Sequence, residues 1–332
     1  MRFKAMFPVL LEGFFTDRLM RQRNASPNTI ASHRDTFRLI LSFAQDRLKK
    51  APSKLTIEDL DAPFIGIFLD HLEKERGNVA RSRNVRMAAI RSFFKYVALE
   101  EPSHSALAQR VLAMPNKRFK RRAIEFLTRP EVDALLEAPD QSTWTGRRDR
   151  TLLLLAVQTG LRVSELISLR CIDIVLGTGA HVRCTGKGRK ERCTPLRKET
   201  VAALRAWLRQ RDCDSSGTLF PNTRGRNLSR HGVKYILQKH AGSAKQRCPT
   251  LRKKKISPHV LRHTTAMDLL QHGVDLFVIA LWLGHEKVET VQAYLHANME
   301  LKEKALSKTP PFNGGMKRFR PDDELLEFLK GL

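Results

Sequence analysis

The sequence predicts a mainly α-helical protein of two domains, with a small antiparallel β-sheet in the second domain. Three observations support this fold class. A chain of 332 residues has room for two hydrophobic cores. Apolar residues recur at helical spacing through about the first 110 positions. Strand-like alternation of apolar and polar residues is confined to residues 181–196.

The N-terminal part reads as one helix after another. Ser26-Pro27 is a typical helix start, and Asp61 with Pro63 opens the next helix, because Ser and Asp cap free backbone donors and Pro fits the first turn. A further helix is expected over residues 79–99. Its apolar stripe is Met87, Ile90, Phe94 and Val97, and it turns Arg81, Arg83, Arg86 and Arg91 away from that stripe.

Residues 113–126 change character and read as a basic interdomain linker. Pro115 is followed by Lys117, Arg118, Lys120, Arg121 and Arg122 without apolar periodicity. A capping box, Thr128-Arg129-Pro130-Glu131, then begins the second domain. We therefore divide the chain into a helical domain (1–112), the linker (113–126), a second domain (127–308) and a tail (309–332) with a short helix over 322–329.

The second domain is expected to be mixed. Helix is predicted over 147–169 with a break at Thr159-Gly160, over 201–211, over 230–241 and from Pro258 onward. Residues 181–196 form a hairpin with a lysine-rich tip, across which Cys184 and Cys193 are expected to face each other. Residues 245–256 read as a basic loop. Gly273 and Gly284 stand where helices would end, with Asp275 capping the helix between them.

The charge of the chain indicates a polyanionic partner. Sixty Lys and Arg against 34 Asp and Glu give a net charge of +26, and both halves contribute: residues 1–125 carry +11 (24 basic, 13 acidic) and the rest +15. Nucleic acid is the favoured partner, with an anionic membrane or simple solubility as alternatives. No run of about 20 apolar residues is present. Five cysteines without a C-x-x-C pair favour free thiols, and hence a cytoplasmic protein.

The stretch from Ser257 to Tyr294 concentrates polar residues with no obvious packing role. Ser257-Pro258 starts a helix on which His259, Arg262 and His263 share one face. Such a helix start is suited to bind an anion such as a phosphate.

Six residues suit one reaction, the metal-free attack of a phenol on a phosphodiester. Two arginines can clasp the non-bridging oxygens, a histidine can activate the phenol, and a lysine can protonate the leaving oxygen. A two-metal nuclease would need converging carboxylates instead. The six residues are Arg162, Lys187, His259, Arg262, His285 and Tyr294. Gly186-Lys187 lacks the pattern of a P-loop, so ATP use is not supported, and His181, Cys184 and Cys193 are too scattered to favour a metal site.

The chain resembles the tyrosine recombinases of the phage integrase family, close in pattern to the Xer-type branch. Thr159–Leu166 is similar to the family's first-arginine motif, and Gly186–Arg192 to its lysine hairpin. His259-x-x-Arg262, Leu283-Gly284-His285 and the spacing to Tyr294 complete the pattern in the family's order. The N-terminal helices and the linker resemble the family's core-binding, SAM-like domain, so the second domain would be the mixed α+β catalytic domain.

The resemblance implies a role for each residue. Tyr294 would form a 3′-phosphotyrosyl link and release a 5′-hydroxyl, while Arg162, Arg262 and His285 hold the phosphate. His259 would serve the tyrosine as acid and base, and Lys187 would protonate the leaving group. Glu165 would orient the site, and His263 is interpreted as supporting the fold.

The resemblance also implies a tetramer, of one chain or of related recombinases, acting on paired sites in double-stranded DNA without metal, ATP or another cofactor. A C-terminal segment such as 322–329 commonly docks on a neighbouring protomer in this family. Integration, excision or transposition of a mobile element is the favoured task, and resolution of replicon dimers is the alternative. DNA contacts are expected from the helix, linker and loop cations: Arg81, Arg83, Arg86, Arg91, Lys117, Arg118, Lys120, Arg121, Arg122, Arg252, Lys253, Lys254 and Lys255.

Two rival functions remain open at this point. One is a metal-dependent nuclease that uses His259 and His263 as ligands, although it lacks partner carboxylates. The other is a DNA-bound regulator on the same fold that has lost catalysis, against which the intact set of six residues argues.

Overall fold

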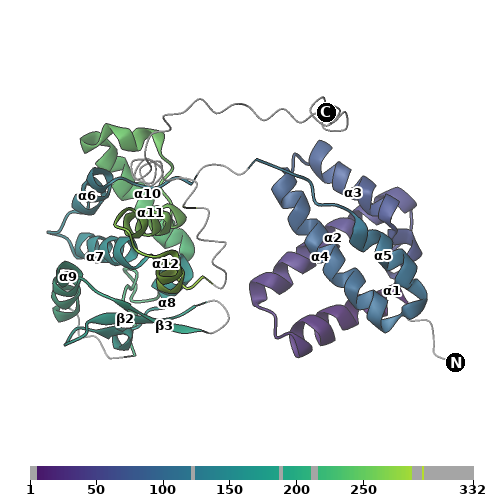
Figure 1. Ribbon diagram of the computed structural model, residues 1–332, viewed down its shortest axis with the longest axis horizontal. Helices are drawn as coiled ribbons and strands as arrows, with labels where there is room; N and C mark the ends of the chain where they lie inside the picture. Colours follow the sequence, from purple (N-terminus) through teal and green to yellow (C-terminus); the bar gives the residue numbers. More distant parts are fainter. Residues whose placement is uncertain (1–5, 121–123, 187–189, 211–215, 286–293, 295–332) are drawn as a thin grey trace, which may run out of the picture. The chain divides into compact units, whose positions relative to one another are not determined.

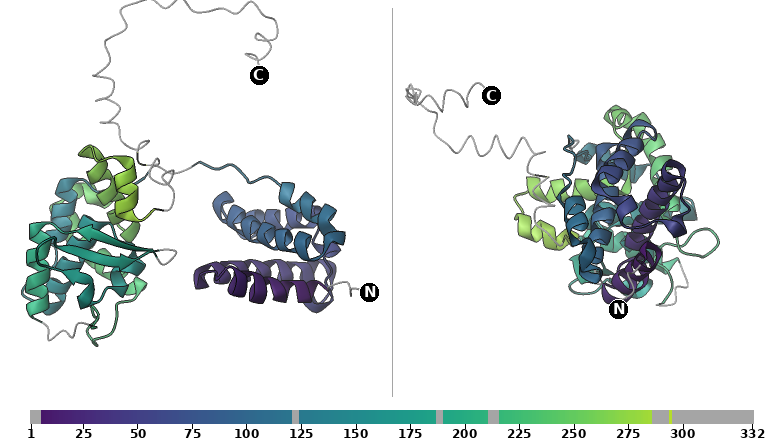
Figure 2. Two further views of the ribbon diagram at one scale, coloured as in Figure 1. Left: turned by 60° about the horizontal axis from the view of Figure 1, so that its bottom comes forward. Right: turned by 90° about the vertical axis from the view of Figure 1, so that its right-hand side faces the viewer.

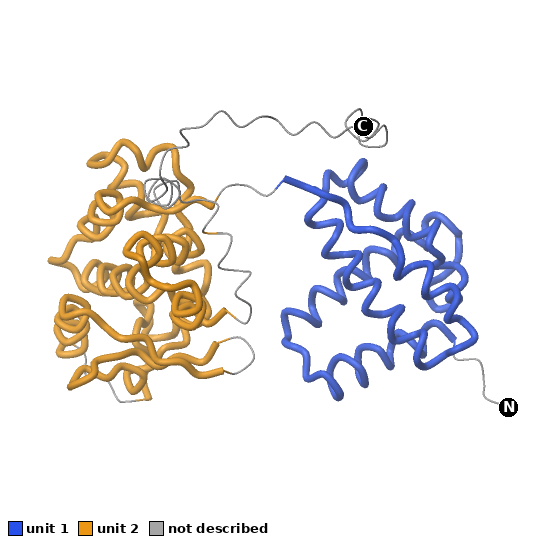
Figure 3. Tube along the Cα trace, in the orientation of Figure 1, with its two compact units in different colours: residues 1–122 blue, residues 123–332 orange. Residues whose placement is uncertain are grey.

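The computed structural model describes residues 6–120, 124–186, 190–210, 216–285 and Tyr294. The chain divides into two compact units, residues 1–122 and 123–332 (Figure 3). The border between the units falls inside the predicted linker, 113–126. The predicted tail, 309–332, lies outside the described residues. Within the described residues, no helix is both long and apolar enough to cross a membrane.

Unit 1 is built from helices throughout its described part (Figure 1). They are α1 (Phe7–Gly13), the π-helical η1 (Phe14–Gln22), α2 (Pro27–Leu48), the 3₁₀ turns η2 (Pro52–Lys54) and η3 (Glu58–Leu60), α3 (Ala62–Lys74), α4 (Ala80–Glu100), the 3₁₀ turn η4 (Pro102–His104) and α5 (Ser105–Ala113). Both predicted helix starts are confirmed. The side chain of Ser26 accepts from the backbone N–H of Thr29, and that of Asp61 accepts from Phe64.

The core of unit 1 is rich in phenylalanine. The rings of Phe14 and Phe37 each meet Phe93 edge to face, with centroids 5.5 and 5.1 Å apart. Helix α4 lies beside α2 and beside α5 in this unit (Figure 2). All four apolar residues predicted for the stripe of α4 are buried. Unit 1 therefore has a hydrophobic core of its own.

Unit 2 is mixed, as predicted, and its sheet lies at one end of the unit, beneath α8 and α12 in Figure 1. Its elements are α6 (Arg129–Glu137), α7 (Trp144–Thr159), α8 (Val163–Ser168), the 3₁₀ turn η5 (Cys171–Asp173), β1 (Ile174–Val175), β2 (His181–Thr185), β3 (Glu191–Pro195), α9 (Lys198–Arg209), α10 (Arg230–Arg247), the 3₁₀ turn η7 (Pro249–Lys253), α11 (Pro258–Gln271) and α12 (Leu276–Leu283). The capping box at Thr128 and Glu131 is confirmed.

The hairpin is confirmed, and β1 joins it to form a three-stranded antiparallel sheet of order β1-β2-β3. The prediction that Cys184 and Cys193 face each other is wrong. Cys184 pairs with Arg192 and is buried, whereas Cys193 pairs with Arg183 and is exposed. A register offset of one residue places the two thiols on opposite faces, because side chains alternate along a strand.

A second prediction about the cysteines, that all of them are free thiols, also differs from the structure. Cys184, Cys193 and Cys248 are free thiols, but Cys171 is disulfide-bonded, so the prediction of free thiols is wrong at Cys171. Sequence spacing could not show this, because a disulfide requires proximity in space and not a short motif.

The basic loop predicted over residues 245–256 is largely helical. Helix α10 runs on to Arg247, past its predicted end at residue 241, and η7 follows almost at once. The buried side chains of Ala244 and Leu251 explain the difference, since both belong to the core of unit 2. The helical breaks at Gly160, Gly273 and Gly284 are confirmed, each with a positive φ.

Candidate active site

The first arginine stands at the junction of two helices. Helix α7 ends at Gly160, whose φ of 63° favours glycine, and a Cβ there would lie 2.6 Å from Cδ2 of Leu283. Two residues later Arg162 adopts an extended conformation and precedes α8. Its Nη2 donates to the carbonyl oxygen of Gly284 at 3.1 Å. The junction therefore brings Arg162 to the end of α12.

Glu165 is the carboxylate at the centre of this junction. Its Oε2 accepts from the backbone N–H of Arg162 at 2.7 Å, and its Oε1 accepts from Nη1 of the same residue at 2.9 Å. Burial raises the pKa of Glu165, but hydrogen bonds from Arg192 and Arg162 outweigh burial and lower it below its ordinary value. Glu165 is thus ionised and holds the Arg162 side chain directly.

Arg192 is a member of this cluster that was not predicted from the sequence. From β3 its Nη2 and Nη1 donate to Glu165 at 2.7 and 3.1 Å, and its Nε donates to the carbonyl oxygen of Trp282 at 3.2 Å. It ties the hairpin to both Glu165 and α12. Arg192 pairs with buried Cys184, so it occupies an inward position where an apolar residue is normal. The sequence did not show this, because it depends on the register of the hairpin.

The second arginine, Arg262, is buried in the first half of α11. Ser257 caps this helix, as predicted, by accepting from the backbone N–H of Val260. Arg262 donates from Nη1 to the carbonyl oxygen of Gly160 at 2.7 Å and from Nη2 to that of Leu283 at 2.6 Å. Burial, with the nearby charge of Arg162, lowers its pKa to about 10, so the guanidinium remains cationic at neutral pH.

His285 follows the helix-ending Gly284 and lies against Arg262. Its Nε2 is 3.1 Å from Nη2 of Arg262. A guanidinium can only donate, so Nε2 accepts and the ring proton is on Nδ1. Burial and the charges of Arg262 and Arg162 lower the pKa of His285 to about 4. His285 is therefore a neutral hydrogen-bond donor beside two cations.

Tyr294 completes the cluster, and its partner was not the one expected. Its hydroxyl lies 2.9 Å from Nδ1 of His263, the histidine that was interpreted as fold support. The phenol is only 2% exposed. His259 is exposed on the first turn of α11, and the described residues offer its side chain no hydrogen bond. Lys187 lies outside the described residues.

The electrostatics of the cluster favour an anion. Among the described residues it contains three guanidinium groups, from Arg162, Arg192 and Arg262, against the single carboxylate of Glu165. Because one carboxylate cannot neutralise three guanidinium groups, the half-buried site has a net positive charge. No three His, Cys, Asp or Glu side chains of the described part gather as ligands for a metal ion.

Several cations predicted to contact DNA also contact protein groups. Arg86 donates to Thr36 at 3.2 Å, and Lys254 donates to Glu131 at 2.6 Å and to the carbonyl oxygen of Phe126 at 2.9 Å. Arg83 and Lys117 both approach Glu73, and Arg91 donates to Asn116. The exposed members are Arg81, Lys117, Arg118, Lys120, Arg252, Lys253 and Lys255, while Arg121 and Arg122 lie outside the described residues.

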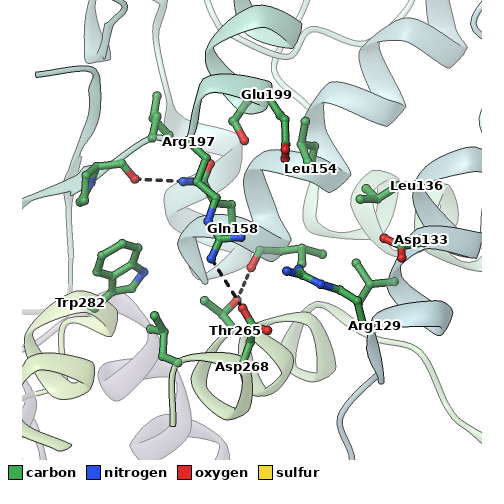
Figure 4. A pocket seen from close by; sticks show the side chains of 16 residues that line it. Arg129, Asp133, Leu136, Leu154, Gln158, Arg197, Glu199, Thr265, Asp268 and Trp282 are labelled. Carbon is green, nitrogen blue, oxygen red and sulfur yellow. Dashed lines mark hydrogen bonds and ion pairs between the residues drawn. The ribbon is translucent and has the colours of Figure 1, made fainter. Parts of the chain in front are cut away.

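A groove elsewhere on unit 2 is separate from the catalytic cluster. It has a volume of about 430 Å³ and lies among α6, α7, α9, α11 and the end of the hairpin (Figure 4). Arg197 and Asp268 approach to 3.9 Å within it. None of the candidate catalytic residues lines it.

Comparison with known proteins identifies the class of protein that this fold and site define. Residues 125–300 match the phage integrase family, and residues 13–101 match the N-terminal SAM-like domain of phage integrases. The chain belongs to the phage integrase family and is a tyrosine recombinase.

Individual relatives agree with this membership. "Putative integrase/recombinase y4rC" of Sinorhizobium fredii is 60% identical over 97% of both chains. The tyrosine recombinase XerC of Pelotomaculum thermopropionicum is 33% identical over 87% of this chain and 94% of its own. Two solved structures share the fold: the XerH recombinase in a post-cleavage complex with difH DNA (TM-score 0.69, 24% identity, 87% and 82% covered) and the Tn1549 transposon integrase with circular intermediate DNA (TM-score 0.67, 16% identity, 89% and 98% covered).

Proposed function

We propose that this protein cleaves and rejoins DNA strands at specific sites through a covalent link to Tyr294. The observation that carries the proposal is the half-buried cluster in which Arg162, Arg262 and neutral His285 lie together near a buried phenol. Catalysis of phosphoryl transfer is largely positional and electrostatic, and this cluster offers fixed donors to the oxygens of one phosphate.

The chemistry follows from the groups present. The phenolic oxygen of Tyr294 attacks the phosphorus atom, a 3′-phosphotyrosyl bond forms, and the bond to the 5′-oxygen breaks. Arg162, Arg262 and His285 bind the non-bridging oxygens, and Glu165 holds Arg162 in place. Lys187, on the hairpin tip, supplies the proton to the departing 5′-oxygen. The free 5′-hydroxyl of a second strand then reverses these steps, so the phosphotyrosyl bond conserves the energy needed for rejoining.

Double-stranded DNA is the proposed partner, and the structure adds a surface to the cations named above. The solvent face of α10 presents Arg230, His231, Lys234 and Lys239, with Tyr235 among them at 68% exposure. Basic side chains on one helix face, with no carboxylate among these residues, suit a phosphate backbone. We propose this row, with the exposed cations of the linker and η7, as part of the DNA contact surface.

We further propose a tetramer on paired sites, in the cytoplasm, that needs neither metal nor ATP. The phosphotyrosyl intermediate supports independence from ATP, and the arginine cluster supports independence from metal. The name integrase/recombinase carried by the relative at 60% identity supports a role in the integration, excision or transposition of a mobile element.

A nicked suicide substrate tests the proposal. The substrate is built on the DNA site that the full chain selects from fragmented genomic DNA, and covalent adduct is measured on a denaturing gel. Wild type should form the adduct in the presence of EDTA, and Tyr294→Phe should form none. Tyr96→Phe, which alters a tyrosine in the core of unit 1, is the matched control and should behave as wild type. An adduct on Tyr294→Phe would refute the assignment of the nucleophile, and a need for divalent cation would refute the metal-free mechanism.

A further inference from the structure

The proposed mechanism does not explain the hydrogen bond between His263 and Tyr294. His263 lies on α11 directly after Arg262, and its Nδ1 is 2.9 Å from the hydroxyl of Tyr294. The two rings meet at 61° with centroids 5.5 Å apart. Tyr294 belongs to a buried apolar cluster that also includes Ala266, Met267 and Leu283. The imidazole therefore meets the tyrosine at its reactive oxygen and not along its ring face.

The protonation states of the pair make the imidazole the acceptor. Burial, with the charges of His259 and Arg262, lowers the pKa of His263. Burial raises the pKa of Tyr294, and the charges of Arg262 and Arg162 partly oppose this. At neutral pH a neutral imidazole thus faces a neutral phenol. Because a phenol is a stronger acid than a neutral imidazole, the O–H donates and Nδ1 accepts.

We propose that His263 is a catalytic residue that takes the proton from Tyr294 as the phenolic oxygen attacks DNA. The inference rests on the proposed function. As the bond from the Tyr294 oxygen to phosphorus forms, the phenolic proton moves to Nδ1 of His263. The bond from phosphorus to the 5′-oxygen breaks, and that oxygen takes its proton from the separate general acid. In the rejoining step His263 returns its proton to the tyrosine.

The cationic surroundings of His263 are compatible with this role once DNA is bound. An imidazolium beside Arg262 is unfavourable in the free protein, which keeps Nδ1 unprotonated and ready to accept. The incoming phosphodiester brings negative charge to the same site and stabilises the imidazolium when it forms. His259, exposed at the start of α11, is then left to contact the DNA phosphate.

Two substitutions separate proton transfer from positioning. His263→Asn keeps a polar atom near the position of Nδ1 but cannot take up a proton, and His263→Ala removes both. Adduct formation is measured in single turnover on the suicide substrate, together with DNA affinity and the thermal midpoint. Both variants should lose roughly 10²–10⁴-fold in the rate of adduct formation, with affinity and midpoint near wild type. His272→Ala, an exposed histidine at the end of the same helix, is the matched control.

Chemical rescue decides whether proton uptake is the missing function. Added imidazole should restore adduct formation by His263→Ala, whereas pyrazole, a ring of the same size but a much weaker base, should not. Equal rescue by both compounds, or a wild-type rate in His263→Asn, would overturn the proposal. Rescue of a His259→Ala variant by imidazole, without rescue of His263→Ala, would return the role to His259. Failure of the wild type to form any adduct would refute the proposed function itself, and with it this inference.

Discussion

At the scale of single residues, neutral carbonyl oxygens hold the arginines of the site, so most of their positive charge is not neutralised. Arg262 donates to the carbonyl oxygens of Gly160 and Leu283, and Arg162 donates to that of Gly284. These carbonyls belong to the last positions of α7 and α12, where backbone acceptors lack partners and the helix dipole is negative. Neutral acceptors thus satisfy most of the buried donors, and Glu165 is the one carboxylate among the described partners.

Arg192 provides a test of how the hairpin supports this cluster. Arg192→Ala should destabilise the protein by roughly 1–3 kcal/mol, because buried Glu165 loses a two-point partner but keeps Arg162. We expect adduct formation to fall by up to about 100-fold, since Arg162 loses its fixed orientation. Denaturant unfolding and single-turnover cleavage measure the two effects.

The matched control for Arg192 is Arg183→Ala on the neighbouring strand. Arg183 is exposed, and the hydrogen bond found for its guanidinium goes to the carbonyl oxygen of Ile172. It should therefore lose little stability and no cleavage. If both variants lost activity equally, the proposed link from Arg192 through Glu165 to Arg162 would be incorrect.

At the scale of elements, the site depends on where α12 ends. Asp275 caps the start of this eight-residue helix, and Gly284 ends it with a φ of 63°. Two acceptor carbonyls and His285 lie within the last three residues of this turn. The glycine end of this short helix thus places two carbonyl oxygens that hold the arginines, and His285, within three consecutive residues.

Gly284→Ala should therefore harm both stability and cleavage. The left-handed conformation costs about 1–2 kcal/mol for a residue with a Cβ. That Cβ would also lie 2.8 Å from Nη1 of Arg192, which Glu165 holds in place. Thermal unfolding and adduct formation measure the two losses.

Gly273→Ala separates these two causes. Gly273 has a φ of 77°, but nothing lies within 4 Å of a Cβ built on it. The variant should show the conformational cost alone and keep wild-type cleavage. Equal loss of cleavage in both alanine variants would mean that contact with Arg192 is not what matters.

At the scale of the whole molecule, the chain has two separate hydrophobic cores and a strong net positive charge. Each unit buries its own hydrophobic cluster, and the net charge of +26 is spread over both. Charge of this size acts on binding and association and does not determine a fold. The net charge of the whole chain thus favours binding to a polyanion.

DNA affinity should accordingly fall steeply with salt, and the α10 row should account for part of the dependence. Each lysine that neutralises a phosphate contributes about 0.9 to the slope of log affinity against log salt. Lys234→Ala with Lys239→Ala should therefore reduce the slope by about 2 if both contact phosphates. Lys74→Ala on α3, an exposed lysine beside Asp70, is the control. An unchanged slope in the double variant would remove α10 from the DNA surface.

Much of the fold, including the ends of the helices that carry the candidate site, could be predicted from sequence because the signals are local. Helix starts at Ser26, Asp61 and Ser257, and helix ends at Gly160 and Gly284, follow from capping chemistry within a few residues. The hairpin follows from alternation of period two. Interactions between distant elements were not predictable in this way. The prediction that Cys184 and Cys193 face each other was wrong for that reason. A register depends on pairing along the entire strand.

The sequence by itself determined the fold class. It also predicted the two arginines, the histidine after Gly284 and the tyrosine as candidate site residues, because each stands in a motif with its own local chemistry. Only the tertiary structure decided which side chains touch. It brings Arg192 into hydrogen-bond contact with Glu165, 27 positions earlier in the chain, and His263 into contact with Tyr294, 31 positions later. Those contacts depend on how β3, α8, α11 and α12 pack, and packing is a property of the whole core that no single motif encodes.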